Sequence, residues 1–73
     1  MNVERIRRRL YGGGFKPFRL CLSDGTKIRV PHPEFVALGR NVVLAVDAKD
    51  RTYILDPLHI VALEDVHRRT KSR

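Results

Sequence analysis

The chain is poor in cysteine and aromatic residues, and it has no long apolar run. It holds one cysteine, Cys21, and no tryptophan, and aromatic residues make up 7% of its 73 positions. One thiol forms no internal disulfide and completes no cysteine-based zinc site, so we expect a reducing, cytoplasmic environment. Because no apolar stretch approaches roughly 20 residues, and none follows the first five positions, we expect neither a membrane span nor a secretory signal.

Negative charge is scarce, and positive charge is concentrated at the two ends of the chain. The formal net charge is +7. Residues 1–30 carry eight Lys or Arg against two acidic residues, residues 31–67 carry three against six, and residues 68–73 add four more cations. This asymmetry favours a polyanionic partner, such as nucleic acid or an acidic surface.

The first segment has the pattern of a short amphipathic helix. Asn2 is a suitable N-cap, and Val3, Ile6 and Leu10 form one apolar stripe at helical spacing. Glycines 12–14 follow, and glycine enters the left-handed conformation that ends a helix without steric cost. We therefore expect a helix over about residues 2–11, with a hinge at the glycines.

After Phe15 the apolar period changes from helical to alternating, and a hairpin is expected. A two-residue turn at Asp24-Gly25 would place apolar and charged residues on the same side of the sheet. A three-residue loop with Gly25 left-handed instead pairs Leu22 with Thr26, Leu20 with Ile28 and Phe18 with Val30. Since this second register gives one apolar face, it is the one we predict.

The rest of the chain predicts further short strands joined by turns. Prolines 31 and 33 end the hairpin, residues 35–38 fit either a strand or a helical turn, and residues 42–46, 51–55 and 60–63 each predict a strand. The predicted fold is mostly β with one N-terminal helix: a small antiparallel meander of four or five strands curling into a barrel. Residues 1–65 would form one domain, and residues 66–73 a basic flexible tail.

This order of one helix and a strand meander resembles the Sm-like branch of the SH3-like small barrels over roughly residues 3–64. The stretch of residues 53–61, Tyr-Ile-Leu-Asp-Pro-Leu-His-Ile-Val, falls where Sm-like proteins have their fourth and fifth strands. The patterns PFRLxLxDG and VPHPEF also resemble a group of short uncharacterised bacterial proteins. The Sm Ile-Arg-Gly motif is absent, because Ile54 is followed by Leu55 and Asp56, and so is the bacterial Tyr-Lys-His signature. The resemblance therefore implies a fold and transfers no RNA-contacting residue.

One set of side chains forms a candidate binding surface. In the predicted register Arg19 lies opposite Arg29, and Cys21 lies opposite Lys27, on the outward face of the hairpin. Like charges in directly opposed positions destabilise a sheet slightly, so the pairing suggests an anion-binding role, although a solvated face that resists aggregation is an equally good reading. With the basic helix, the candidate nucleic-acid-binding residues are Arg5, Arg8, Arg9, Lys16, Arg19, Lys27 and Arg29.

No catalytic, metal-binding or cofactor-binding pattern is evident. His32 and Glu34 flank a proline in a segment where neighbouring side chains diverge, and the three histidines lack ligand spacing. The glycines follow a helix and lack the Lys-Ser or Lys-Thr pair of a phosphate loop. Tyr53 and Cys21 remain weak candidates for a stacking platform and a reactive thiol.

The sequence thus predicts a small basic module that is not an enzyme and takes no cofactor, membrane or small-molecule substrate. The expected mode is contact with the backbone of RNA or DNA through the helix and first hairpin, with little sequence reading. The alternative is a protein-interaction or regulatory module acting through strand edges, with self-association into a homo-oligomer under either reading.

Overall fold

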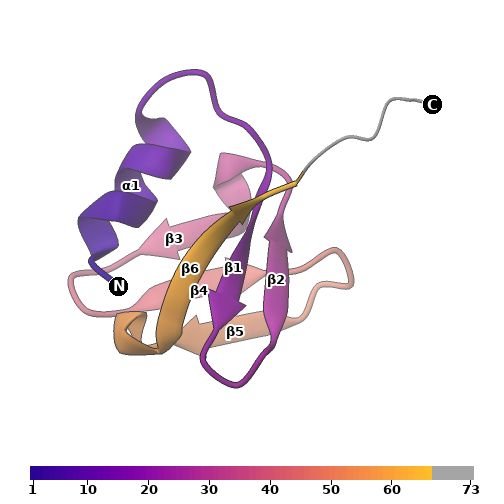
Figure 1. Cartoon of the computed structure of the whole chain (residues 1–73). Helices are drawn as coiled ribbons and strands as arrows, with labels where there is room; N and C mark the ends of the chain where they lie inside the picture. Colours follow the sequence, from indigo (N-terminus) through magenta and orange to yellow (C-terminus); the bar gives the residue numbers. More distant parts are fainter. Residues whose placement is uncertain (67–73) are drawn as a thin grey trace.

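The computed structural model describes residues 1–66. They form one helix, six strands and two short 3-10 turns, all shown in Figure 1. In chain order the elements are α1 (Val3–Tyr11), β1 (Phe18–Leu22), β2 (Lys27–Val30), η1 (Pro33–Phe35), β3 (Val36–Leu38), β4 (Val43–Val46), β5 (Thr52–Leu55), η2 (Pro57–His59) and β6 (Ile60–Asp65).

The predicted helix is confirmed, and its two ends have clear causes. The Asn2 side chain accepts a hydrogen bond from the N–H of Glu4 at 2.7 Å, which satisfies one of the free donors of the first turn. At the other end the N–H of Gly12 donates to the carbonyl of Arg8 at 2.8 Å. A Cβ at Gly12 would lie 2.4 Å from that carbonyl oxygen, so the close approach that ends α1 requires a glycine here.

The predicted hairpin register is also confirmed. Phe18 pairs with Val30 and Leu20 with Ile28, and the N–H of Leu22 donates to the carbonyl of Thr26 at 2.8 Å. Gly25 has a φ of 93°, as the three-residue loop requires. The apolar side chains of both strands therefore point to one side, where they are buried.

The strands lie in two antiparallel sheets of three, in the orders β2-β1-β6 and β3-β4-β5. In Figure 1 the first sheet crosses in front of the second, and α1 lies beside them. Ten buried apolar residues fill the space between these elements: Ile6, Leu10, Phe18, Leu20, Ile28, Val30, Val36, Val43, Ala45 and Ile60. Phe15 and Phe35 are half-buried against it.

The architecture agrees with the prediction in class and differs in detail. Six strands are present where four or five were expected. For residues 35–38 the sequence fitted either a strand or a helical turn. The structure has both in succession: Phe35 ends the η1 turn that Pro33 begins, and the rest of the segment forms β3. Within residues 1–66 no strand pairing joins the two sheets, so this part of the chain forms no closed barrel.

The last strand is longer than predicted. We expected it to end at Leu63, but β6 continues to Asp65 and pairs with β1 along its length. The N–H of Val66 still donates to the carbonyl of Pro17 at 3.3 Å. Of the basic tail predicted over residues 66–73, positions 67–73 lie outside the described residues.

Candidate anion-binding surface

Four of the seven predicted cations lie along one side of α1 and the loop that follows it. Two adjoining hollows of about 330 and 260 Å³ share Arg8 and Arg9 as lining residues. The larger is completed by Arg5 and Leu63, and the smaller by Gly12 to Gly14 and Lys16. We call these hollows together the helix groove.

Arg9 is the fixed member of the helix groove. Its guanidinium lies 5.0 Å from the ring centre of buried Phe18, a cation–π contact, and forms an ion pair with Asp65. It also donates to the carbonyl of Lys16 at 3.4 Å. Its side chain is 26% exposed, and its position is held from three sides. Arg9 therefore anchors the groove more than it offers free charge.

Arg5, Arg8 and Lys16 supply the free charge of the helix groove. All three are exposed. Within residues 1–66 none of them forms an ion pair, in contrast to Arg7, which is paired with Glu4 at 2.8 Å. Three cations that form no ion pair within residues 1–66 line this groove, so they can attract an anion without first breaking an internal contact.

The hairpin cations are in a different situation. Arg19 and Arg29 are directly opposed, as predicted, but Glu64 of β6 lies beside them. Its carboxylate accepts from Arg19 Nη1 at 2.9 Å and from Lys27 Nζ at 3.4 Å. The hydrogen bonds from Arg19, and then those from Lys27, hold the pKa of Glu64 below its usual range. Arg29 remains exposed and is unpaired within residues 1–66.

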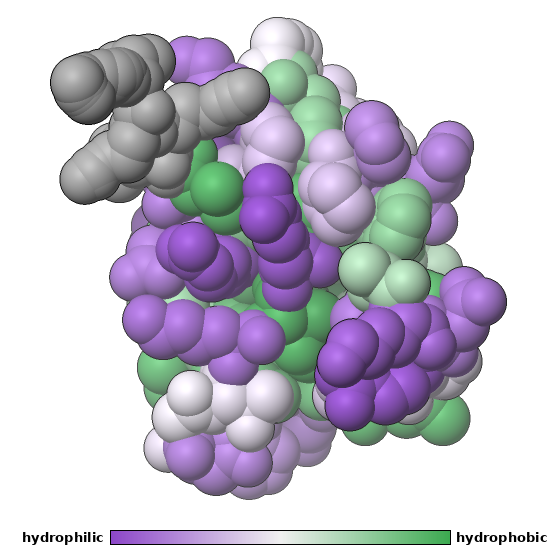
Figure 2. All heavy atoms as spheres, turned by 90° about the vertical axis from the view of Figure 1, so that its right-hand side faces the viewer, coloured by the Kyte–Doolittle hydropathy of each residue, from purple (hydrophilic) through white to green (hydrophobic). Residues whose placement is uncertain are grey.

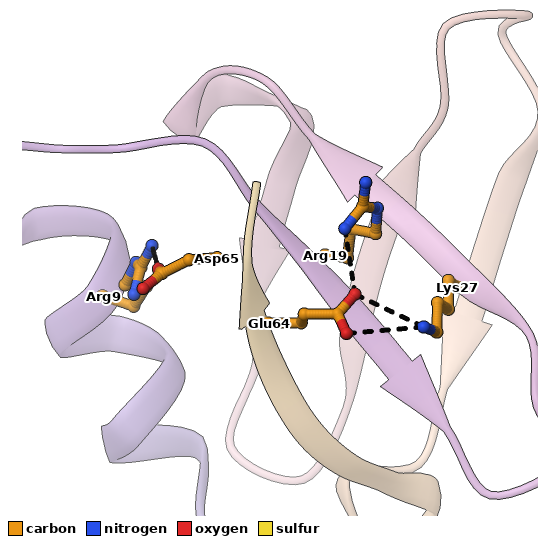
Figure 3. A network of polar contacts seen from close by, with 5 residues as sticks. All are labelled: Arg9, Arg19, Lys27, Glu64 and Asp65. Carbon is orange, nitrogen blue, oxygen red and sulfur yellow. Dashed lines mark hydrogen bonds and ion pairs between the residues drawn. The ribbon is translucent and has the colours of Figure 1, made fainter. Parts of the chain in front are cut away.

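Strand β6 therefore separates the two basic surfaces with a pair of carboxylates. Figure 3 shows Asp65 turned toward Arg9 on one side of β6, and Glu64 turned toward Arg19 and Lys27 on the other. Sequence reasoning missed these contacts, because it ended the strand at Leu63. A signal was available in the sequence: two acidic residues follow the apolar stretch 60–63, and the hairpin carries more cations than acidic residues.

Known proteins offer no guide to this surface. No family model, curated protein or solved structure matches the chain. Its function must be argued from its own residues.

A second polar cluster stabilises the loop between β4 and β5. The Asp47 carboxylate accepts from the N–H groups of Lys49 and Arg51 at 2.8 and 3.0 Å, from Arg51 Nε at 2.8 Å and from the Tyr53 hydroxyl at 3.0 Å. Desolvation opposes ionisation, but these hydrogen bonds outweigh it and hold the pKa of Asp47 far below its usual range. The hydroxyl of half-buried Tyr53 is therefore engaged, which disfavours Tyr53 as a stacking platform.

The remaining candidates show ordinary surroundings. The ring of His32 lies 5.9 Å from that of Phe35 at a tilt of 42°, and the carbonyl of His32 accepts from the N–H of Phe35 in the η1 turn. Cys21 is half-buried and opposite Lys27. Among residues 1–66 no three His, Cys, Asp or Glu side chains gather as metal ligands would. In that same part of the chain no helix has the length and apolarity of a membrane span.

The face at the right-hand side of Figure 1 is largely polar. Figure 2 shows hydrophilic side chains spread over most of it, with apolar surface visible between them. The apolar surface on this face is thus divided by hydrophilic side chains.

Proposed function

We propose that this protein is a small, non-catalytic module that binds the phosphate backbone of nucleic acid. The observation that carries the proposal is the helix groove, where exposed Arg5, Arg8 and Lys16 surround hollows anchored by Arg9. Phosphate contacts of this kind give affinity that depends on salt and reads little sequence.

The hairpin plays a secondary part in this proposal. Glu64 carries one negative charge and contacts both Arg19 and Lys27. These two residues therefore have less positive charge available for a phosphate than two free cations would have. Arg29, unpaired within residues 1–66, is the hairpin residue most available to a phosphate. No catalytic residue, metal or cofactor enters the proposal.

The proposal includes the setting of the protein and its fold relationship. We place it in a reducing cytoplasm, of bacterial origin, on the basis of the free thiol of Cys21 and the resemblance of its motifs. We also propose that its two crossed sheets are a small, open variant of the Sm-like and SH3-like barrels, supported by the position of α1 before a run of short antiparallel strands.

A second candidate function is interaction with other proteins, or with a second copy, through strand edges. Exposed apolar side chains on the β3-β4-β5 sheet, Leu44 and Ile54, favour it. Apolar surface beside an unpaired strand is a common feature of sites where another strand is added.

Two variants of equal charge test the phosphate-backbone proposal. Arg5→Gln with Arg8→Gln removes two cations of the helix groove, and Arg40→Gln with Lys49→Gln removes two exposed cations elsewhere. Binding to labelled duplex DNA and single-stranded RNA is followed by fluorescence anisotropy over a range of salt. We expect the first variant to reduce the slope of log K against log salt on duplex DNA by about 1.8, at 0.9 for each phosphate contact, and the second to leave it nearly unchanged.

The controls separate position from net charge. Equal losses in the two variants would show that only the total charge matters, and the helix groove would be rejected as the site. No binding by the unsubstituted protein, even at low salt, would reject nucleic acid as the partner. Circular dichroism of each variant shows whether the fold is retained.

A further inference from the structure

Within residues 1–66 the two sheets have four edge strands, and three of them carry features that oppose pairing with another chain. Strand β2 presents exposed Lys27 and Arg29 and is followed directly by Pro31. Strand β3 has three residues and follows the η1 turn. Strand β6 has α1 beside it, where Leu63 lines the helix groove. Charge, proline, short length and a covering helix are the usual means of protecting an edge.

Strand β5 lacks the charge and the proline that protect β2. Its sequence, Thr-Tyr-Ile-Leu, contains no charge and no proline. Ile54 is 74% exposed, and its cross-strand neighbour Leu44 is 39% exposed. An uncharged edge that displays an apolar side chain is suited to receive another strand.

The backbone of β5 is oriented for such an addition. The N–H of Asp47 donates to the carbonyl of Arg51 at 3.0 Å, which makes these residues a hydrogen-bonded pair in the β4–β5 register. Hydrogen-bonded and non-bonded pairs alternate along an antiparallel ladder. Tyr53 therefore bonds to β4, whereas Thr52 and Ile54 direct their N–H and C=O groups to the open edge.

A hollow of about 380 Å³ lies next to the end of β5. It is lined by residues 54–56, by residues 22–24 of the hairpin and by His59. Leu22 and Leu55 give it apolar walls, and Asp24 and Asp56 place carboxylates on its rim. The Asp24 carboxylate accepts a hydrogen bond from the N–H of Thr26, and the Asp56 carboxylate accepts one from the N–H of Leu58, each at 2.9 Å.

We propose that the β5 edge and this hollow together bind an extended peptide segment of another protein, rich in β-formers and carrying a lysine or arginine. Side chains of an added strand alternate between the two faces. Apolar residues would lie beside Ile54, and the residue between them would place its aliphatic stem in the hollow and its charge at Asp24 and Asp56.

Charge and size favour this occupant over a second copy of the chain. In an antiparallel pair of β5 strands, the cation nearest the acidic rim would be Arg51 of the second copy, and Arg51 is already paired with Asp47 at 2.8 Å. A pair of four-residue strands is also short for the roughly 1,000 Å² that a stable interface buries. This inference rests on the second candidate function and is independent of the helix groove, which lies on other elements.

The test is a titration followed by NMR amide exchange. The probe is a capped heptapeptide, acetyl-STVKVTS-amide, with matched peptides in which the lysine is glutamate or the two valine nitrogens are methylated. We expect the amides of Thr52 and Ile54 to slow in exchange on binding, while the amide of Tyr53, already bonded to β4, changes little. The glutamate and methylated peptides should bind at least about tenfold more weakly, since the first repels the rim and the second cannot complete the ladder.

Protein variants locate the site. Ile54→Pro removes an N–H that points away from β4, and should weaken binding at least about tenfold. Lys27→Pro is its matched control on the other exposed edge, because the Leu22–Thr26 bond makes the N–H of Lys27 point outward as well. Asp24→Asn with Asp56→Asn retains the turn acceptors and should weaken binding about fivefold through lost ion pairing.

Three results would overturn the proposal. One is no slowing at Thr52 and Ile54 at millimolar peptide. A second is equal binding of the lysine and glutamate peptides, which would show that Asp24 and Asp56 do not contribute to binding. A third is sedimentation showing a dimer that Ile54→Pro dissociates, which would make a second copy the occupant and retain edge pairing as a general function. Since the methylated peptide leaves the protein unchanged, the test does not depend on every variant folding.

Discussion

Replacing Glu64 by glutamine gives the sharpest test of how charge is arranged on the hairpin. This carboxylate contacts Arg19 at 2.9 Å and Lys27 at 3.4 Å, and all three side chains are partly exposed. Glutamine has nearly the same shape, so the change removes the charge and keeps the packing. The net charge of Arg19, Lys27, Arg29 and position 64 rises from +2 to +3.

The magnitude follows from counting the cations that are released. If Glu64 holds both Arg19 and Lys27 away from phosphate, its loss makes two more contacts available. At 0.9 for each contact, the salt slope on duplex DNA should steepen by about 1.8. Over a fourfold change in salt, that slope corresponds to an additional loss of affinity of about 12-fold.

The assay is fluorescence anisotropy with labelled duplex DNA between 50 and 200 mM salt. Glu34→Gln is the matched control: Glu34 is exposed, lies in η1 and forms no ion pair within residues 1–66, so it changes the net charge alone. Equal slopes for the two variants would refute the reasoning, because Glu64 would then not be masking the hairpin cations from phosphate.

Two further predictions concern stability. Ile6→Ala should lower the free energy of unfolding by about 2–5 kcal/mol in urea titrations, because Ile6 is fully buried and belongs to a helix too short to form alone. That loss is a large part of the roughly 3–10 kcal/mol expected for a domain of this size. A loss no larger than that of Val3→Ala, at a half-buried position, would contradict the prediction. Acid should also lower the melting temperature, because folding lowers the pKa values of Asp24, Asp47 and Glu64. These carboxylates stabilise the folded state at a pH above their unfolded pKa values of 3.8 to 4.5. That stabilisation is lost as the pH falls through their folded pKa values. A melting temperature that is constant from pH 7 to pH 3 would refute it, and Asp47→Asn should flatten the dependence.

Local signals made much of the fold predictable. The helix begins at Asn2 and ends at Gly12 because both ends are governed by hydrogen bonds within a few residues. The hairpin register could be chosen between two alternatives, because only one of them places Leu20 and Ile28 on the same face. In each case the deciding interactions lie close together in the sequence.

The candidate surface was less predictable, because its charges are paired across the fold. Glu64 and Asp65 follow an apolar strand and read as the start of a polar tail. Their partners Arg19 and Arg9 lie far away in the sequence, and only the pairing of β6 with β1 brings them together. A count of cations therefore overstated the free charge of the hairpin. It described the helix side, where Arg5 and Arg8 are unpaired within residues 1–66, more accurately.

The pairing of the first strand with the last has a consequence for how the chain folds. Phe18 lies opposite Asp65, so residues 19–64 separate two positions that must meet. Closing so long a loop before its contacts form is slow, and at a synthesis rate of 5–20 residues per second β6 follows β1 from the ribosome by roughly 2–8 s. During that time the hairpin can form, but the side of β1 that later holds β6 stays open. The hairpin thus waits for β6, and the core can close only after β6 has been synthesised.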